Sequence, residues 1–317
     1  MFSIIIPTYN RRELLLKTIK SVISQTFGDF EIIIVDDGSI DNTFELFKDK
    51  IDPRIRYERL KKNSGVNVAR NKGIELAKGD FLIFLDSDDE LFPHALEKIF
   101  SVLKKELGSG VISAPFKTQT GLMTGFERTS GPMEYPVILC GIGEREIKNG
   151  LIAIRREILG DVRFVAPNLD FVFYRKLAKK TTFYYIEEAL GQYNISTDQN
   201  SLHNKRKIPN VKLSIVRAGA LVDFLKEFGN DIIKHCPNNY GYYAYGASIG
   251  LLLEGRKKET GLLMNTAIKY QPSFFQYKLV KLLAIIPFSR LILRFLFFLK
   301  FFYINFKIFG QNLFYKK

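Results

Sequence analysis

Acidic side chains at one point of the chain have the type and spacing that suit binding of a phosphorylated ligand. Asp86, Ser87 and Asp88 come directly after the hydrophobic segment 81–85. Two carboxylates at positions i and i+2 of a turning chain can approach a ligand from one side. Hard cations such as Mg²⁺ or Mn²⁺ prefer carboxylate and phosphate oxygens, and they neutralise charge that grows on a leaving group. Short acidic runs are also common in turns and helix caps, so this run alone is weak evidence.

A second acidic pair follows another hydrophobic segment. Asp36 and Asp37 come after segment 31–35 and precede Gly38. A carboxylate in this place can accept hydrogen bonds from a nucleobase N–H or a ribose hydroxyl. The alternative is a turn that an aspartate caps and in which Gly38 takes a positive φ.

The first hydrophobic segment, 4–6, is followed by Pro7, Thr8 and Tyr9. An aromatic ring at this point can stack on a nucleobase. The alternative is that Pro7 ends a strand and Asn10 caps the helix that comes next.

These three groups of polar residues need a scaffold that brings them together. Segments 4–6, 31–35, 55–57 and 81–85 are mostly hydrophobic, with Glu31 and Arg56 as the charged exceptions, and helical patterns lie between them. Continuous hydrophobic strands that alternate with helices predict an α/β fold with a Rossmann-like, mostly parallel sheet and helices on both faces. Ligands of such sheets bind beyond the carboxyl ends of the strands, so we expect the three polar strand ends to meet at one edge.

The rest of the chain gives weaker patterns. Segment 151–154 predicts a strand, 170–179 a helix, and 212–269 several helices. Segment 108–150 is rich in glycine and predicts loops and short strands.

The chain of 317 residues has a formal net charge of +14, which suggests an anionic partner. The positive excess lies at the C-terminal end, because residues 260–317 contain no Asp or Glu. Segment 277–314 mixes Leu, Ile and Phe with basic residues, and its uncharged stretches are too short to span a bilayer. On a helix, one broad sector would hold Arg290, Arg294, Lys300 and Lys307.

We therefore expect residues 276–317 to form a basic amphipathic helix that lies on an anionic membrane surface. The alternative is an amphipathic helix that packs on its own domain. Nucleic acid is a poorer explanation of the charge, because the basic residues lie in a Phe-rich tail that matches no nucleic-acid-binding module.

Two further observations predict the cellular compartment of the protein. Cys140 and Cys236 lie far apart in the sequence and form neither a disulfide framework nor a zinc-binding spacing, which favours a reducing compartment. The N-terminal hydrophobic run ends at Pro7 and has no basic region before it, which is unlike a signal peptide. We expect a cytoplasmic protein that associates peripherally with the inner face of the membrane.

Taken together, the strand ends resemble the family 2 glycosyltransferases, whose catalytic domain has the nucleotide-diphospho-sugar transferase (GT-A) fold. The matching segments are 3–10 (SIIIPTYN), 24–27 (SQTF), 31–39 (EIIIVDDGS), 63–65 (NSG), 69–73 (ARNKG) and 84–89 (FLDSDD). The resemblance is dense over residues 1–100, weakens toward residue 205 and is absent beyond. It implies a GT-A catalytic domain at 1–210. The helical pattern and the basic tail predict a helical extension at 211–275 and a membrane-associating helix at 276–317.

The resemblance also implies roles for single residues. It implies that Asp88 and Asp86 ligate Mn²⁺ or Mg²⁺, with Tyr9 near the base and Asp37 hydrogen-bonded to it. Contacts to the nucleotide-diphospho-sugar donor are implied for Pro7, Thr8, Tyr9, Asp36, Asp37, Arg70 and Asp86.

In this family the general base usually belongs to a Glu-Asp pair that opens a later helix. Here Asp170 matches the aspartate, and Leu169 stands where the glutamate is expected. The resemblance implies an inverting displacement in which Asp170 takes a proton from an acceptor hydroxyl. The structural alternative for Asp170 is the N-cap of the helix.

The sequence thus predicts an inverting, metal-dependent glycosyltransferase that acts on a glycan or lipid-linked acceptor in surface polysaccharide biosynthesis. An alternative is a non-catalytic nucleotide-sugar-binding or scaffold subunit, which Leu169 keeps open. A dinucleotide-dependent oxidoreductase would need a glycine fingerprint after the first strand, and residues 7–12 contain no glycine.

Overall fold

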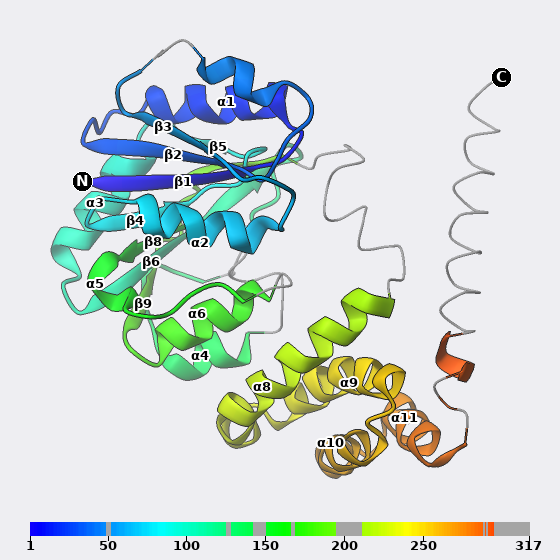
Figure 1. Ribbon diagram of the computed structural model, residues 1–317. Coiled ribbons are helices and arrows are strands. Elements are labelled where there is room, and N and C mark those ends of the chain that lie inside the picture. Colours follow the sequence, from blue (N-terminus) through cyan, green and yellow to red (C-terminus); the bar gives the residue numbers. More distant parts are fainter. Residues whose placement is uncertain are drawn as a thin grey trace. The chain divides into compact units, whose positions relative to one another are not determined.

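The computed structural model describes residues 1–48, 52–124, 128–141, 150–165, 169–194, 211–287, 289 and 291–294. The chain divides into two compact units, Met1–Thr197 and Asp198–Lys317 (Figure 1). Each unit is described by itself.

The first unit is built on a mixed β-sheet. Its described strands are β1 (Phe2–Thr8), β2 (Phe30–Asp36), β3 (Ile55–Arg59), β4 (Phe81–Phe84), β5 (Glu90–Leu91), β6 (Ser109–Thr118), β7 (Gly131–Met133), β8 (Gly150–Arg155), β9 (Thr182–Tyr185) and β10 (Gly191–Tyr193). The order is β3-β2-β1-β4-β8-β6-β10-β5, with β9 beside β6 and β7 beside β9. Strands β3, β2, β1 and β4 are parallel, so their carboxyl ends share one edge, while β8 is antiparallel to β4 and β6.

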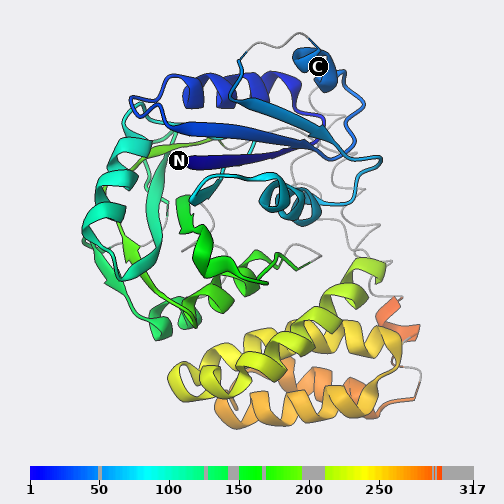
Figure 2. The same ribbon diagram turned by 60° about the vertical axis from the view of Figure 1, so that its left-hand side comes forward.

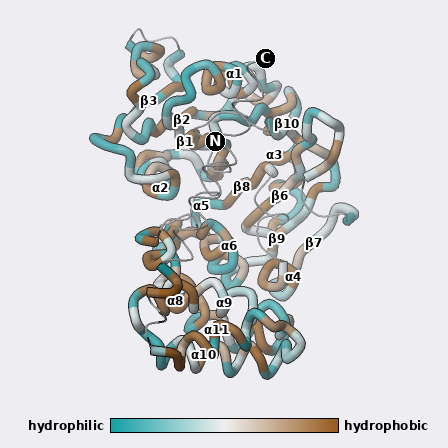
Figure 3. Tube along the Cα trace, turned by 90° about the vertical axis from the view of Figure 1, so that its right-hand side faces the viewer, coloured by the Kyte–Doolittle hydropathy of each residue, from teal (hydrophilic) through white to brown (hydrophobic). Residues whose placement is uncertain are grey.

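Helices cover both faces of this sheet. They are α1 (Arg12–Ile23), α2 (Val66–Leu76), α3 (Ala95–Lys105), α4 (Tyr135–Cys140), α5 (Arg156–Leu159) and α6 (Asp170–Ala178), with a short 3₁₀ helix η1 (Thr43–Phe47). Because side chains alternate along a strand, Ile4 and Ile6 pack with α1 and α3, while Ile5 packs with α2 and α6. Figures 1 and 2 show α1 and α2 on opposite sides of β1. Strands β6 and β8 are brown, hence hydrophobic, in Figure 3.

This architecture confirms the predicted α/β fold with helices on both faces of the sheet. The predicted elements at 151–154 and 170–179 correspond to β8 and α6. Segment 108–150 is more regular than expected, because it contains the ten-residue strand β6.

Two smaller expectations are wrong. Asn10 does not cap α1: Arg11 is the N-cap residue, and Asn10 has φ 52° and accepts a hydrogen bond from Ile40 N at 2.7 Å. Asn10 therefore joins two loops instead of closing a helix. The cysteines were expected to be reduced, but neither Cys140 nor Cys236 is a free thiol, so they give no argument for a reducing compartment.

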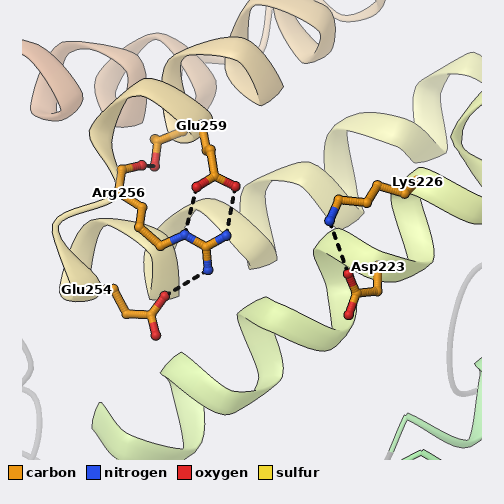
Figure 4. Close-up of polar contacts among 6 residues, drawn as sticks. Asp223, Lys226, Glu254, Arg256 and Glu259 are labelled. Carbon is orange, nitrogen blue, oxygen red and sulfur yellow. Dashed lines mark hydrogen bonds and ion pairs between the residues drawn. The ribbon is translucent and has the colours of Figure 1, made fainter.

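The described part of the second unit is helical, as the sequence predicts, with α8 (Val211–His235), α9 (Pro237–Glu254), α10 (Lys257–Tyr270) and α11 (Phe275–Ile285). Between α9 and α10, Gly255 takes the left-handed conformation at φ 87°, and Arg256 forms ion pairs with Glu259 at 2.7 Å and Glu254 at 3.0 Å (Figure 4). This glycine and these ion pairs fix the reversal of the chain between the two helices.

Among the residues that the structure describes, no helix has the length and hydrophobicity needed to cross a membrane. Most of the basic tail predicted to bind a membrane, residues 295–317 together with Arg290, lies outside the described residues. The predicted boundaries at 210 and 275 stay predictions.

Candidate active site

The polar loops after β1 and β2 are bonded to each other. Asp36 lies opposite Thr8 in the register of the two strands, and Asp37 N donates a hydrogen bond to Thr8 O at 2.8 Å. One loop further, Asn10 N donates to Ser39 Oγ at 2.9 Å. The first two polar strand ends therefore lie together, as a parallel sheet predicts.

Arg11 connects this pair of loops to the third strand end. Its guanidinium contacts Asp88 Oδ2 at 2.8 Å, and both side chains are largely buried. Asp88 belongs to the turn that follows β4. All three strand ends thus meet at one edge, although sequence reasoning did not identify Arg11 as the residue that joins them.

Asp36 is occupied by contacts that hold its own loop. It is fully buried, and it accepts hydrogen bonds from Ser39 N at 2.7 Å and from the hydroxyl of Tyr57 at 2.5 Å. Burial and the neighbouring Asp36 raise the pKa of Tyr57 far above its ordinary value, so the phenol stays a donor. The described contacts of Asp36 are therefore structural.

Asp37 fixes the loop that leads into α2. Its two oxygens accept hydrogen bonds from Ser64 N at 2.7 Å and Gly65 N at 2.8 Å. Burial raises the pKa of the Asp37 carboxyl, and the two backbone N–H groups oppose that shift. Gly38 has φ +79°, and a Cβ there would lie 2.9 Å from the Lys62 backbone, so this close approach of two loops requires glycine.

Among the remaining donor-site candidates, Pro7 and Thr8 are buried in β1, and Tyr9 follows the strand in a partly exposed position. Their placement at the end of β1 puts them beside Asp36 and Asp37.

The turn after β4 concentrates negative charge. Asp86, Asp88 and Asp89 each place a carboxylate oxygen within 4.8 Å of the others. Burial, reinforced by Asp86 and opposed by Arg11, raises the pKa of Asp88 to about 6. Burial and the charges of Asp86 and Asp88 also raise the pKa of Asp89. Carboxylates this close repel one another when they are ionised. A divalent cation offsets this repulsion, so the cluster fits such a cation.

Asn194, at the end of β10, holds this turn in shape. Its backbone N–H donates to Asp89 Oδ1 at 3.2 Å, and its side-chain amide donates to Asp88 O at 2.8 Å. Sequence reasoning assigned a role to neither Asp89 nor Asn194. Asp89 could have been found as the third carboxylate of the run 86–89, whereas nothing in the sequence relates Asn194 to that run.

Arg70 bridges two of the predicted site residues. One side of its guanidinium contacts Asp86 Oδ1 at 2.8 Å, and another contacts Asp170 Oδ2 at 3.1 Å. Although burial works against it, the charges of Asp86 and Asp170 raise the pKa of Arg70 above its ordinary value. The arginine is therefore a fixed positive charge between the acidic turn and the candidate base.

Asp170 is the first residue of α6, and Leu169, fully buried, takes the N-cap position. Asp170 is thus not the N-cap that was its structural alternative. The chain just before α6 is held by α2: the Asn71 amide exchanges two hydrogen bonds with the backbone of Phe164, at 2.9 and 3.0 Å, and Asn67 Nδ2 donates to Val165 O at 2.8 Å. Helix α2 therefore carries Arg70 and also anchors the segment that leads toward Asp170.

Comparison with known proteins identifies the family. Residues 3–162 match the family model described as glycosyl transferase family 2. A Bacillus subtilis protein, provisionally named teichuronic acid biosynthesis glycosyltransferase TuaG, is 31% identical over 240 residues, which cover 71% of this chain and 91% of that protein. The chain belongs to glycosyl transferase family 2. It is therefore a glycosyltransferase by family.

Two staphylococcal proteins add a partial sequence match and a match of fold. The poly(ribitol-phosphate) β-N-acetylglucosaminyltransferase TarP of Staphylococcus aureus is 44% identical over 108 residues, 32% of this chain and 33% of that protein. The crystal structure of S. aureus TarS 1–349 in complex with UDP-GlcNAc matches with a TM-score of 0.63 at 20% identity, over 88% of this chain and 90% of that one. This likeness confirms the GT-A fold expected from the sequence.

Proposed function

We propose that this family 2 member is an inverting glycosyltransferase that moves a sugar from a nucleotide-diphosphate donor to a glycan or lipid-linked acceptor. The observation that carries the proposal is the bridge from Asp86 through Arg70 to Asp170, at 2.8 and 3.1 Å. It joins the acidic turn after β4, which would hold a cation for the donor diphosphate, to a carboxylate that can take a proton. The surface-polysaccharide role is supported by the names of TuaG and TarP.

In the proposed reaction, an acceptor hydroxyl oxygen attacks the anomeric carbon while the bond from that carbon to the diphosphate oxygen breaks. Asp170 receives the hydroxyl proton, and the electron pair of the broken bond leaves on the nucleoside diphosphate. Attack from the face opposite the leaving group inverts the anomeric configuration. Arg70 orients the Asp170 carboxylate, because its guanidinium faces that carboxylate directly.

Asp86 and Asp88, with Asp89 beside them, would hold Mn²⁺ or Mg²⁺, whose charge lowers the energy of a departing diphosphate. Arg11 neutralises Asp88 in the described structure and would be available to the diphosphate itself. Asp36 and Asp37 shape the nucleotide-binding loops. Any contact of Asp37 with the base must use the remaining lone pairs of its oxygens.

Transfer and hydrolysis assays on a panel of nucleotide sugars test this function. We expect one donor to turn over in the presence of Mn²⁺, and chelation to stop the reaction. A non-catalytic nucleotide-sugar-binding subunit would bind a donor with Mn²⁺ yet neither transfer nor hydrolyse it. That outcome would overturn the proposal.

We also propose that the enzyme works at the inner face of an anionic membrane. This is motivated by nine Lys and Arg residues, with no Asp or Glu, in segment 260–317. A lipid-linked acceptor would be reached most easily by an enzyme held at that surface.

A further inference from the structure

Helix α11 presents hydrophobic side chains to solvent on the face opposite to its packed face. Its buried residues are Tyr277, Val280 and Ala284. Its exposed hydrophobic residues, here called the α11 stripe, are Phe275 (71% exposed), Leu279 (43%), Leu282 (53%) and Ile285 (72%). Hydrophobic residues gathered on an exposed helix face mark a surface that another apolar phase covers.

The helix is held so that the stripe faces outward. Tyr277 packs against Gly241 of α9 so closely that a Cβ at Gly241 would lie 2.5 Å from the tyrosine ring. The Tyr277 hydroxyl donates to Gln271 Oε1 at 2.9 Å, and Lys257 Nζ donates to Ile286 O, just after the helix, at 2.8 Å. Turning the stripe inward would break these contacts.

Positive charge accompanies the stripe. Lys278 is exposed and lies within about 50° of the stripe's centre on a helical projection, and Lys281 is half-buried beside it. Neither lysine forms an ion pair with any residue that the structure describes. Since residues 260–317 contain no Asp or Glu, the neighbouring sequence offers no acidic partner.

The hydrophobic and basic surface continues past the helix. Leu291 is 68% exposed and Ile292 39% exposed, and Arg294 follows them. The sequence from 295 to 317 adds more Phe, Leu and Ile with only Lys as charge. An anionic lipid surface would cover the hydrophobic stripe and also pair with the lysines. An acidic protein would pair with the lysines and leave the stripe exposed.

We propose that the α11 stripe, with Lys278 and Lys281, docks the enzyme on an anionic bilayer. The side chains of Phe275, Leu282 and Ile285 enter the boundary between headgroups and acyl chains. The two lysines contact lipid phosphates. This inference deepens the proposed membrane role, and it names the contact surface and its lipid class.

Flotation of the full chain with phosphatidylglycerol/phosphatidylcholine vesicles tests the inference. The double variant Phe275→Ser with Leu282→Ser should lower the vesicle partition coefficient roughly tenfold to hundredfold, because each side chain loses a large part of its burial energy. Lys278→Gln with Lys281→Gln should weaken binding and its salt dependence. Pure phosphatidylcholine vesicles should bind the wild type poorly.

The matched control is Leu107→Ser with Leu122→Ser, which changes leucines that are 76% and 70% exposed elsewhere. It should bind vesicles like the wild type. Two further measurements distinguish other occupants of the α11 stripe: the melting temperature, and the molecular mass of the protein from light scattering. A stripe covered by residues 295–317 predicts lower melting on substitution with unchanged vesicle binding, and a stripe that joins two copies predicts a dimer that the substitutions dissociate. Either result overturns the inference.

Hydrolysis of a soluble nucleotide sugar serves as an independent readout. Stripe variants should keep it unchanged, because α11 carries no residue of the candidate active site. Loss of vesicle binding with normal hydrolysis separates this inference from the proposed catalytic function. Equal vesicle binding by the wild type and the Phe275 and Leu282 double variant would contradict the inference even if catalysis is demonstrated.

Discussion

Arg70 contacts two carboxylates for which the proposed chemistry has different uses. Asp86 belongs to the cation-binding turn, and Asp170 opens α6 as the candidate base. A fixed positive charge between them attracts both carboxylates and sets their relative position. Such an arrangement ties proton removal on one side to leaving-group stabilisation on the other.

Asp170→Asn tests the base at this scale. The amide keeps the size of the side chain and cannot take a proton, so transfer should fall roughly 10²- to 10⁴-fold. Mn²⁺-dependent donor binding should change little, because the acidic turn is intact. Asp161→Asn, at a fully exposed aspartate, is the control that should leave both activities unchanged. Normal turnover by Asp170→Asn would remove the base assignment.

Asp88 should make cation binding depend on pH. Its pKa is raised from 3.8 to about 6, so the carboxyl of the folded, metal-free protein binds a proton as pH falls through about 6. A cation must then displace that proton, and Mn²⁺ affinity should drop by up to about tenfold per pH unit below this point. Calorimetric titrations with Mn²⁺ between pH 5 and 8 measure the effect. A flat affinity over this range would count against Asp88 as a ligand.

Sequence patterns could name the residues that belong to short, contiguous runs, such as Asp86, Asp88 and Asp170. They could not name Arg11 or Asn194, because what these residues do depends on contacts with Asp88 and Asp89 that lie about 80 to 100 positions away. The hydrogen bonds that Asp36 and Asp37 accept from backbone N–H groups could not be predicted either. They depend on the path of the loops around the two aspartates, which residue types alone do not give.

At the scale of elements, helix α2 connects the strand edge to the segment before α6. It carries Asn67, Arg70 and Asn71, and its Ala69 and Ile74 pack in the hydrophobic core. Gly73 allows this packing to be close, because a Cβ there would overlap the side chain of Ile5 in β1. The distance of α2 from β1 therefore sets the position of Arg70.

Gly73→Ala should destabilise the protein even though alanine favours helices. Overpacking against Ile5 costs about 1–3 kcal/mol, which exceeds the gain of roughly 0.5–1 kcal/mol from helix propensity. Gly261→Ala in α10 is the matched control, since nothing lies within 4 Å of a Cβ built there. It should raise stability by the propensity term. Urea unfolding of both variants measures the two signs, and a stabilised Gly73→Ala would contradict the close packing.

The elements of the first hundred residues could be predicted because hydrophobic strands alternate there with helical periodicity. Strand β6 was missed because Gly110 and Pro115 interrupt its pattern, although the strand is buried over most of its length. The antiparallel direction of β8 between β4 and β6 has no local signal, because direction follows from the path of the chain through segment 108–150.

At the scale of the whole molecule, the candidate active site and the basic C-terminal segment lie in different parts of the chain. The acidic turn, Arg70 and Asp170 belong to the first unit, whereas the acid-free segment 260–317 belongs to the second. Binding of donor and binding of membrane should therefore be separable by substitution. High salt should release the enzyme from anionic vesicles while it leaves Mn²⁺-dependent donor hydrolysis measurable.

Binding of nucleotide sugars in the presence and absence of Mn²⁺, followed by thermal shift, tests the central claim most directly. For the wild type and Asp170→Asn, one donor from a panel should raise the melting temperature only when Mn²⁺ is present. Asp88→Asn should lose this shift, while the exposed control Asp223→Asn should keep it. If no nucleotide sugar binds with Mn²⁺, or if Asp88→Asn binds as tightly as the wild type, the acidic turn is not a cation-dependent donor site.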